Sequence, residues 1–262
     1  PLADWLKEVA PLPPEERLAA VLAKLKECNP GFDGRAVQQR IDGGVVEFEI
    51  TTDQVTDVSP IRALPELQKL ALRGSNWSAG ALADLAPLRS LRIVDLDVFS
   101  NKIVDLSPVA SLPLRRLNCA GNPVTSLEPL RGMKLRDLDA QQCPELKSIA
   151  PLAGMPLAAL NLSATKVSDI APLRGMTTLT DLAFTLSPVR DATPLRGLPL
   201  TRLSTLNSQV TDLSPLRDVP LTWLHCDFVP ERDAALLRSM KLLETINEKP
   251  AAEFWKEVDG GK

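Results

Sequence analysis

Hydrophobic residues recur along most of the chain in a pattern of the form L-x-x-L-x-L. Its last apolar pair alternates with a polar residue, which is typical of a short strand with one buried face. We therefore predict a short strand in each copy, with the intervening residues directed away from the core. The copies begin at Val45, Ile93, Leu114, Leu157, Leu179, Leu200 and Leu221.

A second pattern, a proline phrase, follows the first at a constant distance. It consists of Asp or Ser, an aliphatic residue, a small or polar residue, Pro and an aliphatic residue, as in Asp105-Leu-Ser-Pro-Val109. Proline fixes φ and has no N–H to satisfy, so the phrase predicts a tight 3-10 turn. The leading Asp or Ser is expected to accept a backbone N–H there. The prolines are at 60, 87, 108, 129, 151, 172, 194 and 215, in steps of 27, 21, 21, 22, 21, 22 and 21 residues.

A short polar residue recurs between the strand pattern and the proline phrase, for example Asn122 and Thr165. We expect its side chain to hydrogen-bond backbone groups of the neighbouring repeat. An apolar residue comes two positions later in several repeats, which predicts one further core position for each. These residues are Val55, Ile103, Val124, Val167 and Val210.

The combined unit resembles the leucine-rich repeat family, whose signature is L-x-x-L-x-L-x-x-N/C-x-L. The proline phrase is similar to that of the bacterial class with 21 to 22 residues per repeat, typified by internalins. This resemblance implies an α/β solenoid: a right-handed, curved stack of coils with a parallel β-sheet on the concave side and short 3-10 turns on the convex side. The chain departs from the family pattern by an insertion between Leu72 and Asp84.

Both ends of the chain lack the repeat and predict caps that cover the open ends of the stack. At the start we expect a helix over 13–27 and a hairpin over 36–51. At the end we expect a helix over 230–240, a strand over 243–246 and a helix carrying Phe254 and Trp255. The predicted parts are a helical and hairpin cap over 1–44, eight to nine coils over 45–229, and a second cap over 230–262.

Composition restricts the class of partner. The net charge of −3 and a pI near 5.4 argue against nucleic acid and anionic membranes, which usually select a basic surface. No apolar run approaches the roughly 20 residues of a membrane span, so no membrane partner is expected within this chain. Hydrophobic residues make up 44% of the chain, enough for a sizeable core. We expect a protein or peptide partner, and a monomer or weak dimer.

The cysteines favour a reducing compartment and predict a cytoplasmic location. They are scattered, without the clustered ligands that a zinc site needs, and are expected to be buried thiols. The sequence begins with Pro rather than Met, so removal of a signal or anchor from a longer chain stays open as an alternative. The four residues are Cys28, Cys119, Cys143 and Cys226.

No motif for catalysis is present. The chain has a single histidine, His225, and lacks a G-x-S-x-G elbow, a Walker loop, a dinucleotide-binding glycine pattern and H-E-x-x-H. We therefore predict a binding scaffold that is not an enzyme and uses no cofactor or metal. Two alternatives stay open: a sensor or adaptor region of a larger kinase- or ligase-linked signalling enzyme, and a structural or adhesive surface protein.

Candidate binding residues are the outward positions of the strands and those that follow them, because they differ from repeat to repeat. Asp and Arg residues that recur in the turns are instead attributed to turn capping and a solvated convex face. Packing of Trp223 and Phe228 under the C-terminal cap is an alternative for those two residues. The candidates are Asp95, Asp97, Phe99, Arg116, Asp137, Asp139, Asp181, Arg202, Leu206, Trp223, His225 and Phe228.

Overall fold

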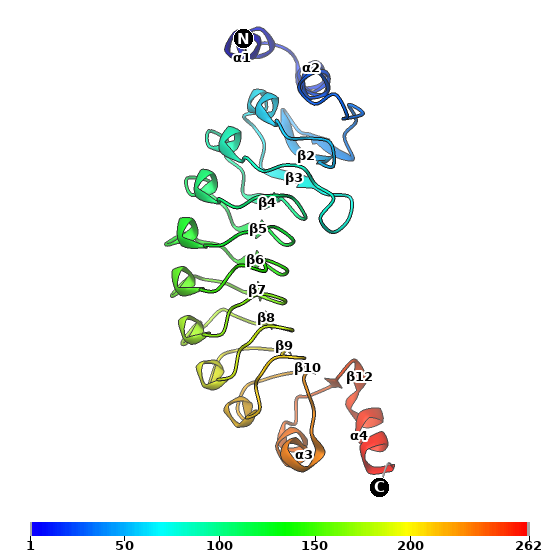
Figure 1. The fold of residues 1–262 in the computed structure, drawn as a ribbon, viewed down its shortest axis with the longest axis vertical. Coiled ribbons are helices and arrows are strands. Elements are labelled where there is room, and N and C mark those ends of the chain that lie inside the picture. Colours follow the sequence, from blue (N-terminus) through cyan, green and yellow to red (C-terminus); the bar gives the residue numbers. More distant parts are fainter. Residues whose placement is uncertain (1, 261–262) are drawn as a thin grey trace. The chain divides into compact units, whose positions relative to one another are not determined.

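The structure is a computed structural model that describes residues 2–260. The chain forms two compact units, Pro1–Leu135 and Arg136–Lys262. In both units the coils place strands on one side and short 3-10 turns on the other (Figure 1). The predicted outer limits of the caps, at residues 1 and 262, lie outside the described residues.

The N-terminal unit begins with the predicted helix and hairpin, preceded by one further helix. The hairpin strands β1 and β2 pair antiparallel, and β3, β4 and β5 then continue the sheet in parallel. The elements are α1 (Leu2–Val9), α2 (Pro14–Cys28), β1 (Gln38–Ile41), β2 (Val45–Thr51), β3 (Lys69–Arg73), β4 (Asp95–Asp97) and β5 (Arg116–Asn118).

The C-terminal unit continues with parallel strands and ends in the elements predicted for its cap. Strand β11 pairs in parallel with β10, and the short β12 then pairs antiparallel with β11. The elements are β6 (Asp137–Asp139), β7 (Ala159–Asn161), β8 (Asp181–Ala183), β9 (Arg202–Ser204), β10 (Trp223–His225), α3 (Pro230–Ser239), β11 (Thr245–Ile246), β12 (Lys249–Pro250) and α4 (Ala251–Gly260).

The core is built from the central residues of the strands, stacked in register. In the N-terminal unit Leu70 pairs with Leu96, and Leu96 with Leu117. The C-terminal unit repeats this arrangement, and every central residue is at most 2% exposed. A single coil cannot enclose these leucines, so each coil depends on its neighbours for its apolar core. The C-terminal residues are Leu138, Leu160, Leu182, Leu203 and Leu224.

All eight proline phrases form 3-10 turns, as predicted. In each, the leading Asp or Ser accepts the N–H two residues ahead, at 2.7–3.3 Å; the Ser107 N–H donates to Asp105 Oδ1 at 2.7 Å. This bond satisfies a donor at the start of the turn. The turns are η1 (Ser59–Ala63), η2 (Ala86–Leu88), η3 (Ser107–Val109), η4 (Glu128–Leu130), η5 (Ala150–Leu152), η6 (Ala171–Leu173), η7 (Thr193–Leu195) and η8 (Ser214–Leu216).

The predicted polar residue between strand and turn bonds the neighbouring coil. Asn122 is 1% exposed, and its amide donates to Val98 O of the preceding coil at 2.9 Å. Its Oδ1 accepts the Ile103 N–H at 3.0 Å. Hydroxyls replace the amide in the C-terminal unit, where Ser187 donates to Leu162 O of the preceding coil at 2.7 Å and Thr165 donates to the same oxygen within its own coil at 2.7 Å. Buried backbone groups between coils are thereby satisfied.

The helices of both caps bury apolar side chains. Leu18, Val21 and Leu25 of α2 are buried, and so are Leu237 and Met240 at the end of α3. Ala234 of α3 is only half-buried. The neighbouring Asp233 is 1% exposed instead, and it accepts the Val229 N–H at 2.8 Å. A carboxylate that begins the helix therefore occupies the inward position.

Candidate functional site

The outward residues of the strands form a surface that we call the strand face. It consists of the first and third residues of each three-residue strand and the residues in register with them on β2 and β3. In the N-terminal unit it holds three predicted candidates: Asp95, Asp97 and Arg116. In the C-terminal unit it holds six: Asp137, Asp139, Asp181, Arg202, Trp223 and His225. Phe99, Leu206 and Phe228 follow their strands in sequence.

Third positions of the strand face carry a structural role that the sequence interpretation did not assign. Oδ1 of Asp97 accepts the Phe99 N–H at 2.9 Å, and Oδ1 of Asp139 accepts the Gln141 N–H at 3.0 Å. Asn118 and Asn161 make the same bond two residues ahead. Each such Asx turn helps direct the chain out of the strand. Asp97 and Asp139 therefore each use one carboxylate oxygen to hold the backbone, in addition to facing outward.

An ion-pair cluster centred on Arg73, at the end of β3, adjoins the N-terminal strand face. Arg73 donates to Asp97 Oδ2 from Nε at 2.8 Å and from Nη2 at 2.5 Å, and its Nη1 lies 3.6 Å from Glu49. The bonds to Asp97 raise the pKa of the Arg73 guanidinium. Asn118 adds an amide hydrogen bond to the same Asp97 oxygen at 3.1 Å. The Asp97 side chain is only 13% exposed as a result.

The inserted segment after β3 forms a tightly bonded loop that places Trp77 on Phe99. The two rings meet edge to face with centroids 4.6 Å apart, and Trp77 remains 45% exposed. Ser100 holds the loop, because its hydroxyl accepts the Ser78 N–H at 2.5 Å and donates to Asn76 O at 2.6 Å. We call Trp77 and Phe99 the aromatic ledge. The loop projects on the side opposite the 3-10 turns (Figure 1).

The C-terminal strand face orders an arginine between an acid and an aromatic ring. Arg202 Nε lies 3.1 Å from Asp181 Oδ2, and its guanidinium carbon lies 4.8 Å from the Trp223 ring centroid. His225 meets Trp223 edge to face at 5.7 Å. The Arg202 side chain is still 53% exposed. These contacts restrict the arginine without covering it, so it can contact a partner at a reduced entropic cost.

Leu186 and Leu206, which follow strands β8 and β9, form a small apolar area in the same unit. Leu206, two residues after β9, is half-buried, and its carbonyl accepts the Leu186 N–H at 3.0 Å. Leu186 is 61% exposed and has φ of 59°, in the left-handed region. A branched side chain rarely adopts this conformation. An exposed leucine in a strained backbone contributes little to the core.

Phe228 packs inside the C-terminal cap. Its ring lies 4.9 Å from Phe254 and 5.8 Å from Trp255, both on α4. Packing under the C-terminal cap, the alternative considered for Trp223 and Phe228, is therefore observed for Phe228. Trp223 instead stacks with Arg202 and His225. We leave Phe228 out of the candidate surface because its ring already has aromatic partners within the chain.

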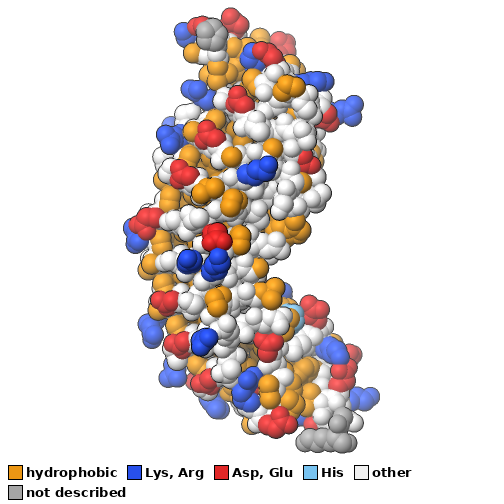
Figure 2. Space-filling model, viewed as in Figure 1, with side chains coloured by type: hydrophobic (Ala, Val, Ile, Leu, Met, Phe, Trp, Pro, Cys, Tyr) orange, Lys and Arg blue, Asp and Glu red, His pale blue; other side chains and the backbone are white. Residues whose placement is uncertain are grey.

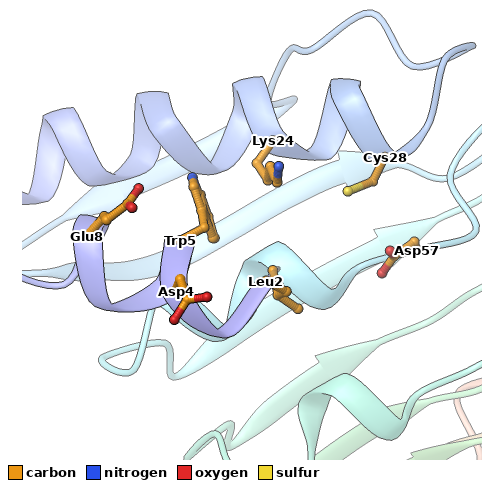
Figure 3. A pocket seen from close by; sticks show the side chains of 7 residues that line it. All are labelled: Leu2, Asp4, Trp5, Glu8, Lys24, Cys28 and Asp57. Atoms are coloured by element: carbon orange, nitrogen blue, oxygen red, sulfur yellow. The ribbon is translucent and has the colours of Figure 1, made fainter.

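The thiols and the groove at the N-terminal helices were considered as candidate sites for chemistry or metal binding. A groove of about 440 Å³ between α1 and α2 is lined by Trp5, Lys24 and Cys28 among others (Figure 3). Burial raises the pKa of the Cys28 thiol, and burial beside Asp233 raises the pKa of Cys226 to about 12. Both thiols are therefore protonated at neutral pH and are weak nucleophiles. Within residues 2–260 no cluster of His, Cys, Asp or Glu could hold a metal ion, and no helix is long and apolar enough to cross a membrane.

Comparison with solved structures decides the fold. An internalin, InlF, from Listeria monocytogenes superimposes with a TM-score of 0.62 and 22% identity over 90% of this chain and 78% of its own. Internalin C2 from the same organism superimposes with a TM-score of 0.61 and 24% identity over 80% of this chain and 92% of its own. This chain has the internalin-like leucine-rich-repeat fold. No protein-family model matches the sequence, and no curated protein matches it.

The leucine-rich-repeat fold typically mediates protein–protein interaction through its extended strand surface. Charge on this chain suits such a role better than binding to a polyanion. Acidic and basic side chains are interspersed on the face seen in Figure 2, without a large area of one sign. A mixed surface of this kind favours selective contacts with a protein over general attraction to nucleic acid.

The sequence interpretation missed Arg73 and Trp77. The strand pattern was assigned only where it precedes a proline phrase by the usual distance. The step from Pro60 to Pro87 is 27 residues, so β3 lies farther from Pro87 than this distance and was not assigned. The signal was nevertheless present, because Leu67, Leu70 and Leu72 spell L-x-x-L-x-L, and all three are fully buried. A search for the strand pattern itself would have placed Lys69 and Ala71 outward and Arg73 at the end of the strand.

Proposed function

We propose that this leucine-rich-repeat protein is a non-catalytic scaffold that binds a partner protein through the strand face of its C-terminal unit. The observation that carries the proposal is the arrangement of Asp181, Arg202 and Trp223. Trp and Arg are the residues most enriched among interface hot spots. Here they occupy neighbouring strands, are restricted by each other, and remain accessible.

The surroundings of this group fit a protein partner. Leu186 and Leu206 supply apolar contacts beside it, while His225 adds a ring with hydrogen-bonding capacity. Charged, apolar and aromatic groups within one small area match the composition of a protein interface. A partner with an acidic or amide group near an apolar side chain could bond Arg202 and pack against the leucines at the same time.

The test uses Arg202→Ala and Trp223→Ala in the complete chain. Partners are first captured with the wild-type protein, and one is then purified for titration calorimetry. We expect each variant to lose about 2 kcal/mol of binding free energy, roughly a 30-fold rise in Kd. Arg217→Ala, at the end of the turn η8, is the matched control and should bind like the wild type.

Melting temperatures measured by circular dichroism separate lost contacts from lost folding. Wild-type affinity in both variants would show that the partner uses another surface. A measured enzymatic turnover that survives both substitutions would contradict the scaffold assignment.

A further inference from the structure

One row of the N-terminal strand face alternates strictly in charge. The strand register places Glu47 beside Lys69, Lys69 beside Asp95, and Asp95 beside Arg116. From β2 to β5 the signs are therefore negative, positive, negative and positive. Neighbouring strands are about 4.8 Å apart, so the four groups form a closely spaced row. Their formal charges cancel.

Contacts within the chain engage Glu47, Asp95 and Arg116 of this row and leave Lys69 exposed. Glu47 accepts a hydrogen bond from Arg40 of the hairpin at 2.8 Å. Asp95 and Arg116 approach only to 3.8 Å, which is too long for a hydrogen bond. Lys69 is exposed, and no acidic oxygen among the described residues lies within ion-pair distance of its ammonium group. The Arg116 side chain is 64% exposed.

A row that alternates in this way is complementary to itself. A two-fold axis parallel to the strands, midway between β3 and β4, reverses the order of the row in a second copy. Lys69 then faces Asp95 of the other copy, and Glu47 faces its Arg116. Each of the four contacts brings opposite charges together, and each residue pair occurs twice, as an isologous interface requires. We propose that the N-terminal strand face binds a second copy of this chain through this row.

The aromatic ledge supplies the apolar part of such an interface. Trp77 lies in the loop after β3 and packs on Phe99 just after β4, so the ledge flanks the two strands nearest the proposed axis. Exposed ion pairs alone contribute only about 0–1 kcal/mol each, so a stable contact needs an apolar anchor. The loop is already ordered by its bonds to Ser100 and to Asp53, which accepts the Ser75 N–H at 2.8 Å. Little further ordering would accompany association.

Self-association through this row is independent of the function proposed for the C-terminal unit. The two surfaces share no residue, and Trp223 and Arg202 take no part in the alternating row. Variants of one surface therefore test one hypothesis only.

The experiment is sedimentation velocity on the full chain over a range of concentrations and salt. We expect a concentration-dependent dimer at low ionic strength that weakens as salt screens the row. Lys69→Glu and Asp95→Lys should each raise the dimer Kd at least about tenfold, since each places like charges opposite one another twice. Trp77→Ala should also weaken the dimer. Arg62→Glu in the turn η1, away from the strand face, is the control.

Two combinations of variants distinguish a contact between two copies from a row of ion pairs that only stabilises the sheet of one chain. An equimolar mixture of Lys69→Glu and Asp95→Lys should dimerise again, because both cross-copy contacts become attractive. The double variant Lys69→Glu/Asp95→Lys should also dimerise, although its row no longer alternates within the chain. If the row only stabilises the sheet within one chain, each single variant should have a lower melting temperature, and mixing the two single variants should not produce a dimer.

A wild-type chain that stays monomeric up to about 1 mM at low salt would overturn the proposal. So would folded single variants whose mixture does not re-associate, or a dimer that Trp223→Ala disrupts as strongly as Lys69→Glu. Melting curves establish folding for every variant, and the double variant keeps the test informative if one single variant unfolds.

Discussion

At the scale of single residues, the backbone repeats a conformation that the side chains only partly suit. A residue with positive φ follows the strand in successive coils, with φ between 50° and 70°. Glycine or asparagine adopts this conformation at low cost, whereas leucine does so at a cost of about 1–2 kcal/mol. Leu186 is therefore the least suitable member of the series. These positions are Ser100, Gly121, Gln142, Ala164, Leu186 and Asn207.

Leu186→Asn is expected to stabilise the protein by about 0.5–1 kcal/mol, because asparagine accepts a left-handed backbone and almost no apolar contact is lost. Urea unfolding followed by circular dichroism measures the change. The reciprocal substitution Asn207→Leu, at the equivalent position of the next coil, should lower stability by a similar amount. If both variants had the same free energy of unfolding as the wild type, the backbone strain at this position would be negligible.

Carboxylates at the turns show how a local bond determines a protonation equilibrium. Hydrogen bonds from Ser107 lower the pKa of Asp105, and hydrogen bonds from Thr193 and Ser214 do the same for Asp191 and Asp212. Because the pKa of each of these carboxyl groups is lower in the folded state than in the unfolded state, the hydrogen bonds stabilise the folded protein at pH values above the unfolded pKa. This stabilisation is lost as pH falls through the folded value. The turns are therefore expected to loosen in acid.

At the scale of elements, the polar residue between strand and turn ties one coil to the next. Asn122 bonds four backbone groups: its two amide N–H groups are shared among three carbonyl oxygens, and its Oδ1 accepts one N–H. Because no water replaces a lost partner in the core, removal of this side chain leaves several groups unsatisfied. This position thus orders the stack, while the leucines supply most of its stability.

Asn122→Ala is expected to cost about 2–4 kcal/mol, since it leaves buried donors and acceptors without partners. Asn122→Thr is the informative comparison, because Thr165 occupies the same position in a later coil and should recover part of the loss. Chemical denaturation gives both values. Alanine and threonine variants of equal stability would contradict a role for the hydroxyl.

At the scale of the whole molecule, the coils within each unit are held by contacts with their neighbours. Leu160 lies in register between Leu138 and Leu182, and all three are at most 2% exposed. A defect in one coil is therefore expected to weaken its two neighbours before it affects more distant coils.

Leu160→Ala should destabilise the C-terminal unit by about 2–5 kcal/mol through lost burial and a cavity. Hydrogen exchange followed by mass spectrometry is expected to show faster exchange over β6, β7 and β8 than over β3 and β4. Uniformly faster exchange across both units would indicate that the chain unfolds as a single cooperative block.

The sequence was sufficient for most of the fold because each coil repeats the same local chemistry. The strands follow from alternation around leucines such as Leu96 and Leu117, and the turns follow from proline after Asp or Ser. The candidate site was less predictable. Asp97 and Asp139 resemble contact residues in sequence, and only geometry reveals that they cap the backbone. Trp77 lies in an insertion, where a periodic rule carries no information.

The Asx turns have a consequence for anyone who wishes to give this scaffold a new target. Substitution at Asp139 or Asn161 removes the bond that directs the chain out of the strand. Variants at these positions are therefore expected to fold less stably. Ala159, Asp181 and Trp223 occupy first positions, and within residues 2–260 none of their side chains accepts the N–H two residues ahead. A combinatorial library confined to these first positions would therefore vary specificity while keeping the framework intact.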